Sequence, residues 1–248
     1  IMVGGLFSTE DLAIYSNMSK ELPYNILSIA VATVLIPKMV FMINNNKIKD
    51  AIDLWGVSIR LSAFVICLAV AATFAFSNQV ISILYSEKYL SGEWVFRVYT
   101  ITSLVKITSW GIVLNSTKNN KRILQVSFLI LFVNLVLNYF LLHKIGIIGA
   151  AIATALSEFI GVFMKLYYSS RVIDIKINKL IPWKELVVFF ASNIMGAMIV
   201  TSVNNFLLDI GVNKFLSMIV LGVIWILIYF LTFRKHVLKD LKILNSVK

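Results

Sequence analysis

Apolar stretches of about 20 residues recur along this chain, and charged or turn-forming residues separate them. A helix of about 20 residues is long enough to cross the hydrocarbon core of a bilayer. Soluble domains carry roughly 25% charged residues. This chain has 14% charged residues, 59% hydrophobic residues and a mean hydropathy of +0.88. The sequence therefore predicts an all-α, polytopic transmembrane helix bundle.

The boundaries of the apolar stretches predict seven spans. These spans cover residues 22–43, 59–85, 94–114, 123–142, 145–168, 186–208 and 215–233. Ser77, Asn78 and Gln79 interrupt the second stretch, so this helix either tilts strongly or extends beyond the bilayer at one end. The fourth and fifth stretches are joined by His143 and Lys144, which predicts an antiparallel helical hairpin.

Lysine and arginine concentrate in alternate connections between the spans. Sixteen of the 23 lie in segments 44–60, 115–122, 165–185 and 234–248, four lie in the other connections, and three lie within spans. Short loops rich in positive charge stay in the cytoplasm. We therefore expect the N-terminal segment outside and the C-terminus in the cytoplasm, an arrangement that requires an odd number of crossings.

The predicted organisation has five parts. These are an outside segment 1–21, a bundle of five helices over 22–168, a cytoplasmic loop 169–185, a terminal helix pair 186–233 and a basic cytoplasmic tail 234–248. The first residue is Ile1, and no basic flank or small-residue cleavage site of a signal peptide follows it. We expect the chain to be a piece of a longer protein, with a helix missing before the outside segment.

An amphipathic segment, residues 46–60, precedes the second span. Its apolar residues recur at helical spacing opposite its charged residues; the apolar set is Ile48, Ala51, Ile52, Trp55 and Ile59, and the charged set is Lys47, Lys49, Asp50 and Asp53. Two interpretations remain open. The segment is an interfacial helix on the cytoplasmic leaflet, or it is a cytoplasmic extension of the second span.

The net charge of +11 could indicate nucleic-acid binding, but the basic residues lie in loops between apolar spans. Attraction to anionic lipid headgroups is a simpler explanation, so we predict the bilayer as a partner and no nucleic acid. Cys67 is the single cysteine and lies within a span, which excludes a disulfide framework and a Cys/His metal site. With no glycine-rich phosphate loop and two histidines in loops or the tail, we predict no metal, no cofactor and no catalytic residue.

Outside the basic segments named above, four charged residues lie within the predicted spans, where a charge costs about 2.5 kcal/mol or more and usually faces a bundle interior. Lys38 and Arg97 lie near span ends, where snorkelling to a headgroup is an equal alternative to a buried role. Lys106 lies near the middle of its span and forms a polar stripe with Tyr99, Thr102 and Ser109. This stripe favours a cavity-lining role for Lys106 over a structural ion pair.

Other polar residues within spans have two interpretations each. Glu158 could pair with Lys106 or Arg97 and hold helices together, or it could line a cavity. Asn134 and Asn138 share a helix face with Ser127 and could hydrogen-bond a neighbouring helix or a sugar hydroxyl. By contrast, the small residues Gly149, Ala153, Ser157 and Gly161 recur every four residues, which favours close helix packing.

Two stretches carry a family resemblance. GGLFSTEDLAIYSNMSKELPYNILSIAVATVLIPKM, residues 4–39, resembles the seventh-to-eighth helix region of polysaccharide flippases in the multidrug/oligosaccharidyl-lipid/polysaccharide exporter superfamily. NLVLNYFLLHKIGIIGAAIATALSE, residues 134–158, resembles their eleventh and twelfth helices. The more specific part is the pattern Asn134, Asn138, Gly146, Gly149, Ala150 and Ala151.

The resemblance implies that the chain is the second lobe of a transporter with up to fourteen helices, whose N-terminal lobe is missing. It implies flipping of an undecaprenyl-pyrophosphate-linked repeat unit by alternating access, for O-antigen, capsule or exopolysaccharide assembly in the bacterial inner membrane. Cavity cations in that family are thought to meet the pyrophosphate. By location we assign this role to Lys106 and Arg97, followed by Lys38, and we add Tyr99, Thr102, Asn134, Asn138 and Glu158 as candidate cavity residues.

Three rival functions remain. A multidrug or cation antiporter of the same superfamily would favour acids within the membrane, whereas here the bases within spans outnumber the acids. A membrane enzyme of glycan assembly would need an acid or histidine cluster at a membrane face, and no such cluster is visible in the sequence. The third rival is a structural fragment that does not transport.

Overall fold

The computed structural model describes residue 5 and residues 7–246, and this part of the chain is helical without strands. The predicted segments 1–21 and 234–248 therefore include positions outside the described residues. The elements are α2 (Thr9–Met18), η1 (Pro23–Asn25), α3 (Ile26–Asn44), α4 (Ile48–Ala75), α5 (Ser77–Leu84), η2 (Glu87–Gly92), α6 (Glu93–Thr102), η3 (Ser103–Ile107), α7 (Ile112–Ser116), α8 (Asn120–Ile145), α9 (Ile147–Ile173), α10 (Ile177–Leu180), α11 (Trp183–Asp209) and α12 (Lys214–Ser246).

Six helices of the described part are long and apolar enough to cross a membrane. They are Pro23–Asn44, Ile48–Ala75, Asn120–Ile145, Ile147–Ile173, Trp183–Asp209 and Lys214–Leu244. Many of their large apolar side chains are exposed, as lipid-facing residues must be. The predicted all-α polytopic membrane bundle is confirmed.

The third predicted span, 94–114, is not a continuous helix. Helix α6 passes into the 3₁₀ turn η3, and Thr108 then adopts an extended backbone with φ −154° and ψ 167°. The hydroxyls of Thr100, Thr102 and Ser103 each donate to the carbonyl four residues earlier, a bond that weakens and bends helices. Local polar chemistry therefore favours the interruption at this point.

Two tryptophans hold the interruption in place. The indole N–H of Trp55, a fully buried residue of α4, donates to Thr108 Oγ1 at 2.9 Å. The indole N–H of Trp110 donates to the carbonyl oxygen of Val105 at 2.7 Å. Because Trp55 belongs to another helix, the break depends on tertiary packing as well as on local sequence.

The amphipathic segment runs directly into the second span, because Ile48–Ala75 is one helix. Ala51, Ile52 and Trp55 are buried within the protein, and Asp53 is exposed. The helix ends at Ala75, Phe76 forms a turn, and α5 follows as a separate short helix that begins at the polar residues Ser77–Gln79.

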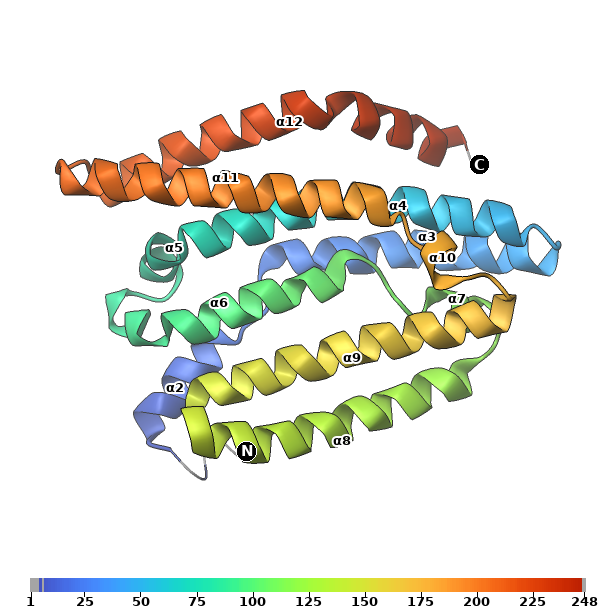
Figure 1. The fold of residues 1–248 in the computed structure, drawn as a ribbon, viewed down its shortest axis with the longest axis horizontal. Coiled ribbons are helices and arrows are strands. Elements are labelled where there is room, and N and C mark those ends of the chain that lie inside the picture. The colour runs from blue at the N-terminus through green and yellow to red at the C-terminus, as the bar shows by residue number, and fades with distance from the viewer. Residues whose placement is uncertain (1–4, 6, 247–248) are drawn as a thin grey trace.

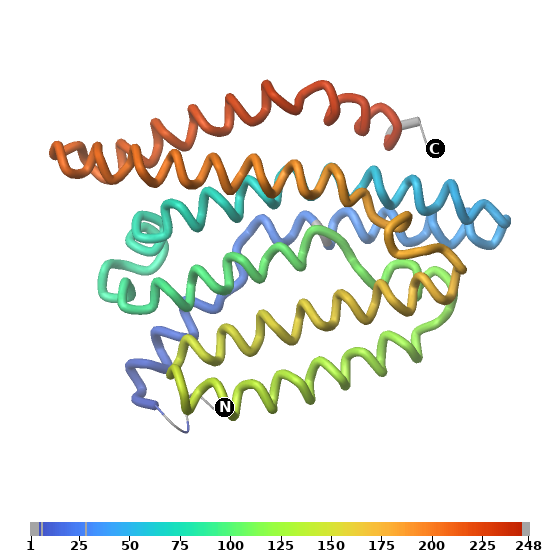
Figure 2. The backbone as a smooth tube through the Cα atoms, in the orientation of Figure 1, coloured from blue at the N-terminus to red at the C-terminus, as the bar shows by residue number. Residues whose placement is uncertain are grey.

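The long helices lie side by side, with α8 and α9 at one edge and α11 and α12 at the other (Figure 1). Helix α4 packs against α3, α11 and α12, and α6 packs against α9. The tube in Figure 2 shows the α3–α4 turn, the α9–α11 connection and the end of α12 at one end of the bundle, and the α8–α9 and α11–α12 turns at the other. The lysine-rich and lysine-poor connections thus occupy opposite ends.

Small residues bring α8 and α9 into close contact. A Cβ on Gly149 would lie 2.2 Å from the carbonyl oxygen of Leu141, and a Cβ on Gly161 would lie 2.3 Å from Ile130 Cδ1. Larger residues at these positions would push the two helices apart. The four-residue spacing of small side chains is therefore used for packing.

Candidate functional site

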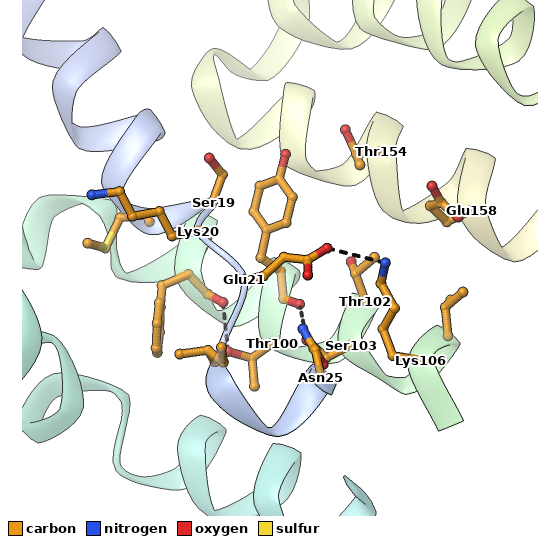
Figure 3. A pocket seen from close by; sticks show the side chains of 15 residues that line it. Ser19, Lys20, Glu21, Asn25, Thr100, Thr102, Ser103, Lys106, Thr154 and Glu158 are labelled. Carbon is orange, nitrogen blue, oxygen red and sulfur yellow. Dashed lines mark hydrogen bonds and ion pairs between the residues drawn. The ribbon is translucent and has the colours of Figure 1, made fainter. Parts of the chain in front are cut away.

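Lys106 is a residue of η3, where the main chain is a 3₁₀ turn and no longer an α-helix. Its Nζ is 3.2 Å from Oε1 of Glu21, in the link between α2 and η1 (Figure 3). The side chains are 43% and 67% exposed, respectively, so water reaches this ion pair. The pair is accessible from outside the protein core and can exchange partners at low cost.

A cavity of about 130 Å³ lies beside this pair. Its walls come from the α2–η1 link, from α6 and η3, and from α9, which contributes Thr154 and Glu158. Figure 3 shows Glu21 and Lys106 joined across the cavity, with Thr154 and Glu158 on the opposite helix. The four charged lining residues are Lys20, Glu21, Lys106 and Glu158, so the formal charges balance.

Hydroxyl groups line the cavity as well. Tyr99 lines it, and its Oη lies 2.6 Å from Oη of Tyr15, a residue that does not line the cavity; the two rings meet edge to face with centroids 6.1 Å apart. Burial raises the pKa of Tyr15, which lies outside the six spans, so this phenol remains neutral. Neutral hydroxyls beside an ammonium group suit a ligand that carries both an anionic group and sugar hydroxyls.

Asn134 and Asn138 lie behind the α9 wall of the cavity. The Asn134 amide donates to Ser157 Oγ at 3.1 Å and to Thr154 Oγ1 at 3.4 Å, and Asn138 donates to the carbonyl and side-chain oxygens of Asn134. The Asn134 contacts join α8 to α9, whereas the Asn138 contacts lie within α8. Neither asparagine lines the cavity, and Thr154 connects their network to it.

Arg97 lies in a different environment. Its Nη2 is 2.8 Å from Glu93 Oε1, and its Nε donates to Ser77 Oγ at 2.9 Å. The guanidinium also packs over the rings of Phe74 and Trp94, each at 5.0 Å. These contacts join α6 to the end of α4 and the start of α5.

The cavity therefore brings together four of the residues singled out in the sequence: Tyr99, Thr102, Lys106 and Glu158. Arg97, Lys38, Asn134 and Asn138 do not line it; Lys38 is half-buried in α3. Within the described residues Glu158 forms no ion pair, and Lys106 contacts Glu21 instead. The sequence around Glu21 did not indicate that it would pair with Lys106, because the two residues are far apart in the sequence.

Comparison with known proteins gives a consistent result. Residues 10–230 match the family described as "Lipid II flippase MurJ". The chain is 23% identical over 206 residues to the "Probable low-salt glycan biosynthesis flippase Agl15" of Haloferax volcanii, covering 82% of this chain and 43% of that protein. It is 26% identical over 187 residues to the "Uncharacterized membrane protein MJ1068" of Methanocaldococcus jannaschii, covering 74% of this chain and 35% of that protein. The chain spans less than half the length of these curated relatives.

Proposed function

The chain belongs to the lipid II flippase MurJ family, and from this we propose that the whole protein moves a lipid-linked glycan across the membrane. The similarity to a glycan biosynthesis flippase supports the same broad class. The earlier resemblance to polysaccharide flippases thus agrees with the family at the level of lipid-linked glycan flippases. We also propose that the protein acts as a transporter and not as an enzyme.

The observation that carries the proposal is Lys106 beside the cavity. A solvated ammonium group, hydroxyls from Tyr99 and Thr102, and a carboxylate from Glu158 surround one hollow at an interrupted helix. Transporters commonly build substrate sites where helices are discontinuous, because unwound backbone is tolerated there only beside a cavity or within protein. Lys106 would bind a phosphate of the substrate as a point charge, and the hydroxyls would bind its sugar.

In finer detail, we propose an undecaprenyl-pyrophosphate-linked repeat unit as the substrate, as used for O-antigen, capsule or exopolysaccharide. We place the protein in the cytoplasmic membrane, the inner membrane of a bacterium, with the C-terminus in the cytoplasm. The charge distribution supports this orientation, because the lysine-rich connections share one end of the bundle. The described residues would form one lobe that works by alternating access with a first lobe of the same protein.

The test uses the protein expressed from its complete natural coding sequence and reconstituted into proteoliposomes. The flipping rate of a pyrophosphate-linked oligosaccharide lipid is compared for the wild type, Lys106→Gln and the matched control Lys144→Gln, an exposed lysine in the last turn of α8. Loss of a charge-assisted contact worth about 1.5–3 kcal/mol predicts a fall of about tenfold or more for Lys106→Gln. The control should keep the wild-type rate.

Equal flipping by wild type and Lys106→Gln would overturn the assignment of Lys106. Failure of the wild type to flip the glycan lipid, with export of a cationic drug instead, would overturn the substrate class.

A further inference from the structure

A second hollow, of about 450 Å³, lies between α4, the start of α11 and the last turns of α12. It is separate from the Lys106 cavity and shares no lining residue with it. One part of its wall is charged or polar, with Arg60, Lys184, Glu185, His236, Lys239 and Asp240. The other part is apolar, with Leu61, Val188, Phe189, Phe233, Val237 and Ile243.

Arg60 and Asp240 form a fixed ion pair in the wall of this hollow. Nε of Arg60 donates to Oδ2 of Asp240 at 2.8 Å, and Nη2 donates to Oδ1 at 2.7 Å. The Asp240 side chain is 8% exposed and the Arg60 side chain is 23% exposed. A guanidinium group has five N–H donors, so this two-bond pair orients Arg60 and leaves donors for a second anion.

The hollow lies where apolar sequence changes to basic sequence. In α12 the apolar run that ends at Phe233 is followed by Arg234, Lys235 and His236, with Lys239 and Lys242 beyond. The start of α11 likewise places Lys184 next to apolar residues. In a bilayer this boundary coincides with the headgroup level, so the basic side meets headgroups and the apolar side meets acyl chains.

Apart from the ion pair, the wall of the hollow has a positive formal charge. Arg60 and Asp240 neutralise each other, and the remaining charges are two positive ones, on Lys184 and Lys239, and one negative one, on Glu185. Basic pockets between transmembrane helices on the cytoplasmic side bind anionic lipid headgroups. The combination of spare guanidinium donors, two lysines and an apolar side matches both parts of a phospholipid.

We propose that this hollow binds an anionic glycerophospholipid of the membrane. Its phosphate contacts Arg60, Lys184 and Lys239, and one acyl chain lies against Phe189 and Phe233. The lipid would then hold α4, α11 and α12 together at this end of the bundle. The proposal depends on the membrane-spanning fold and on the cytoplasmic placement of this end of the bundle proposed above, and it is independent of the transported substrate.

The experiment uses the complete protein, purified in detergent, and native mass spectrometry to count retained lipid. Phosphatidylglycerol is titrated against phosphatidylcholine of the same chain length, with inorganic phosphate as a separate competitor. The cavity variant is Lys184→Gln/Lys239→Gln. The matched control, Lys235→Gln/Lys242→Gln, removes two exposed lysines of α12 that do not line the hollow.

We expect the wild type to retain phosphatidylglycerol over phosphatidylcholine, and the cavity variant to lose about tenfold in phosphatidylglycerol affinity. The control should stay within about twofold of the wild type. Equal loss in the cavity and control variants would overturn the proposal, because it would show diffuse surface attraction. Equal retention of both lipids, or displacement of phosphatidylglycerol by millimolar inorganic phosphate, would also overturn it.

Arg60 is left intact in these variants because its loss would leave Asp240 buried and unpaired. A thermal unfolding curve of each variant shows that it is folded before lipid is counted. The same curves give a second readout, since bound lipid should raise the Tm of the wild type more than that of the cavity variant.

Discussion

Glu21 holds Lys106: the carboxylate from the link after α2 lies 3.2 Å from the ammonium group on the interrupted third segment. The anionic group of the proposed substrate would compete with this acid for the ammonium group. Both side chains are substantially exposed, so the pair contributes little to folding. Glu21 is therefore a competitor for the proposed ligand and a minor contributor to stability.

Neutralising Glu21 should strengthen ligand binding. In Glu21→Gln the ammonium group loses an exposed partner worth about 0.2–1 kcal/mol, so affinity for a pyrophosphate-linked lipid should rise by up to about fivefold. A binding titration in detergent measures this change, with Glu10→Gln as the control because Glu10 is an exposed acid outside the cavity. Weaker binding in Glu21→Gln would mean that Glu21 orients Lys106 for the ligand.

The Arg60–Asp240 pair should be important for stability. Removing one partner of a buried pair costs about 3–5 kcal/mol, and partial exposure of Arg60 reduces the expected cost of Asp240→Asn to about 1–3 kcal/mol. Thermal unfolding in detergent should show a lower Tm than for Asp174→Asn, the control, whose exposed side chain forms no salt bridge within the described residues. Equal Tm values for the two variants would contradict a stabilising role for the pair.

Two glycines of α9 should differ in their tolerance of alanine. At Gly149 the new Cβ would meet the carbonyl oxygen of Leu141, which belongs to the main chain, whereas at Gly161 it would meet the flexible end of Ile130. Gly149→Ala should therefore lose about 1–3 kcal/mol and Gly161→Ala less. Unfolding measurements on both, with Gly222→Ala as a control in open space, test this order. A larger loss at Gly161 would reverse it.

A surface pair at the other end of α12 predicts a pH dependence. The hydrogen bond and positive charge of Lys214 lower the pKa of Glu87 from its ordinary value. Because the folded-state pKa is the lower one, the stabilisation is present above the unfolded pKa and disappears as the pH falls through the folded pKa. The Tm difference between wild type and Glu87→Gln should thus be positive at neutral pH and vanish in acid. A difference that persists at the lowest pH, or that salt fails to reduce, would contradict the ion pair as its cause.

Most of the fold could be predicted from sequence because lipid imposes a strong length constraint. The long apolar runs became helices, and the small-residue spacing at Gly149 and Gly161 was correctly interpreted as helix packing. The break in the segment that contains Lys106 could not be predicted, because it depends on Trp55 from another helix as well as on the local sequence. The hydropathy of a stretch depends only on its own residues and does not show a hydrogen bond to another helix.

The candidate site was predictable in part. The helical spacing of Tyr99, Thr102 and Lys106 placed them on one face, and all three line the cavity. Arg97 has the same charge as Lys106, but it is surrounded by Glu93, Ser77 and two aromatic rings. These come from chain segments whose proximity depends on the turn at Phe76. Charge within a span identified candidates, and tertiary structure determined their partners.

The interruption at Thr108 also limits how the bundle can be oriented within the bilayer. Main-chain amides and carbonyls without intrahelical bonds cost several kcal/mol in hydrocarbon. Residues 105, 107, 108 and 110–114 are all buried, so protein shields this stretch. The unwound stretch therefore cannot turn toward the acyl chains, and the perimeter in contact with lipid must be formed by the continuous helices.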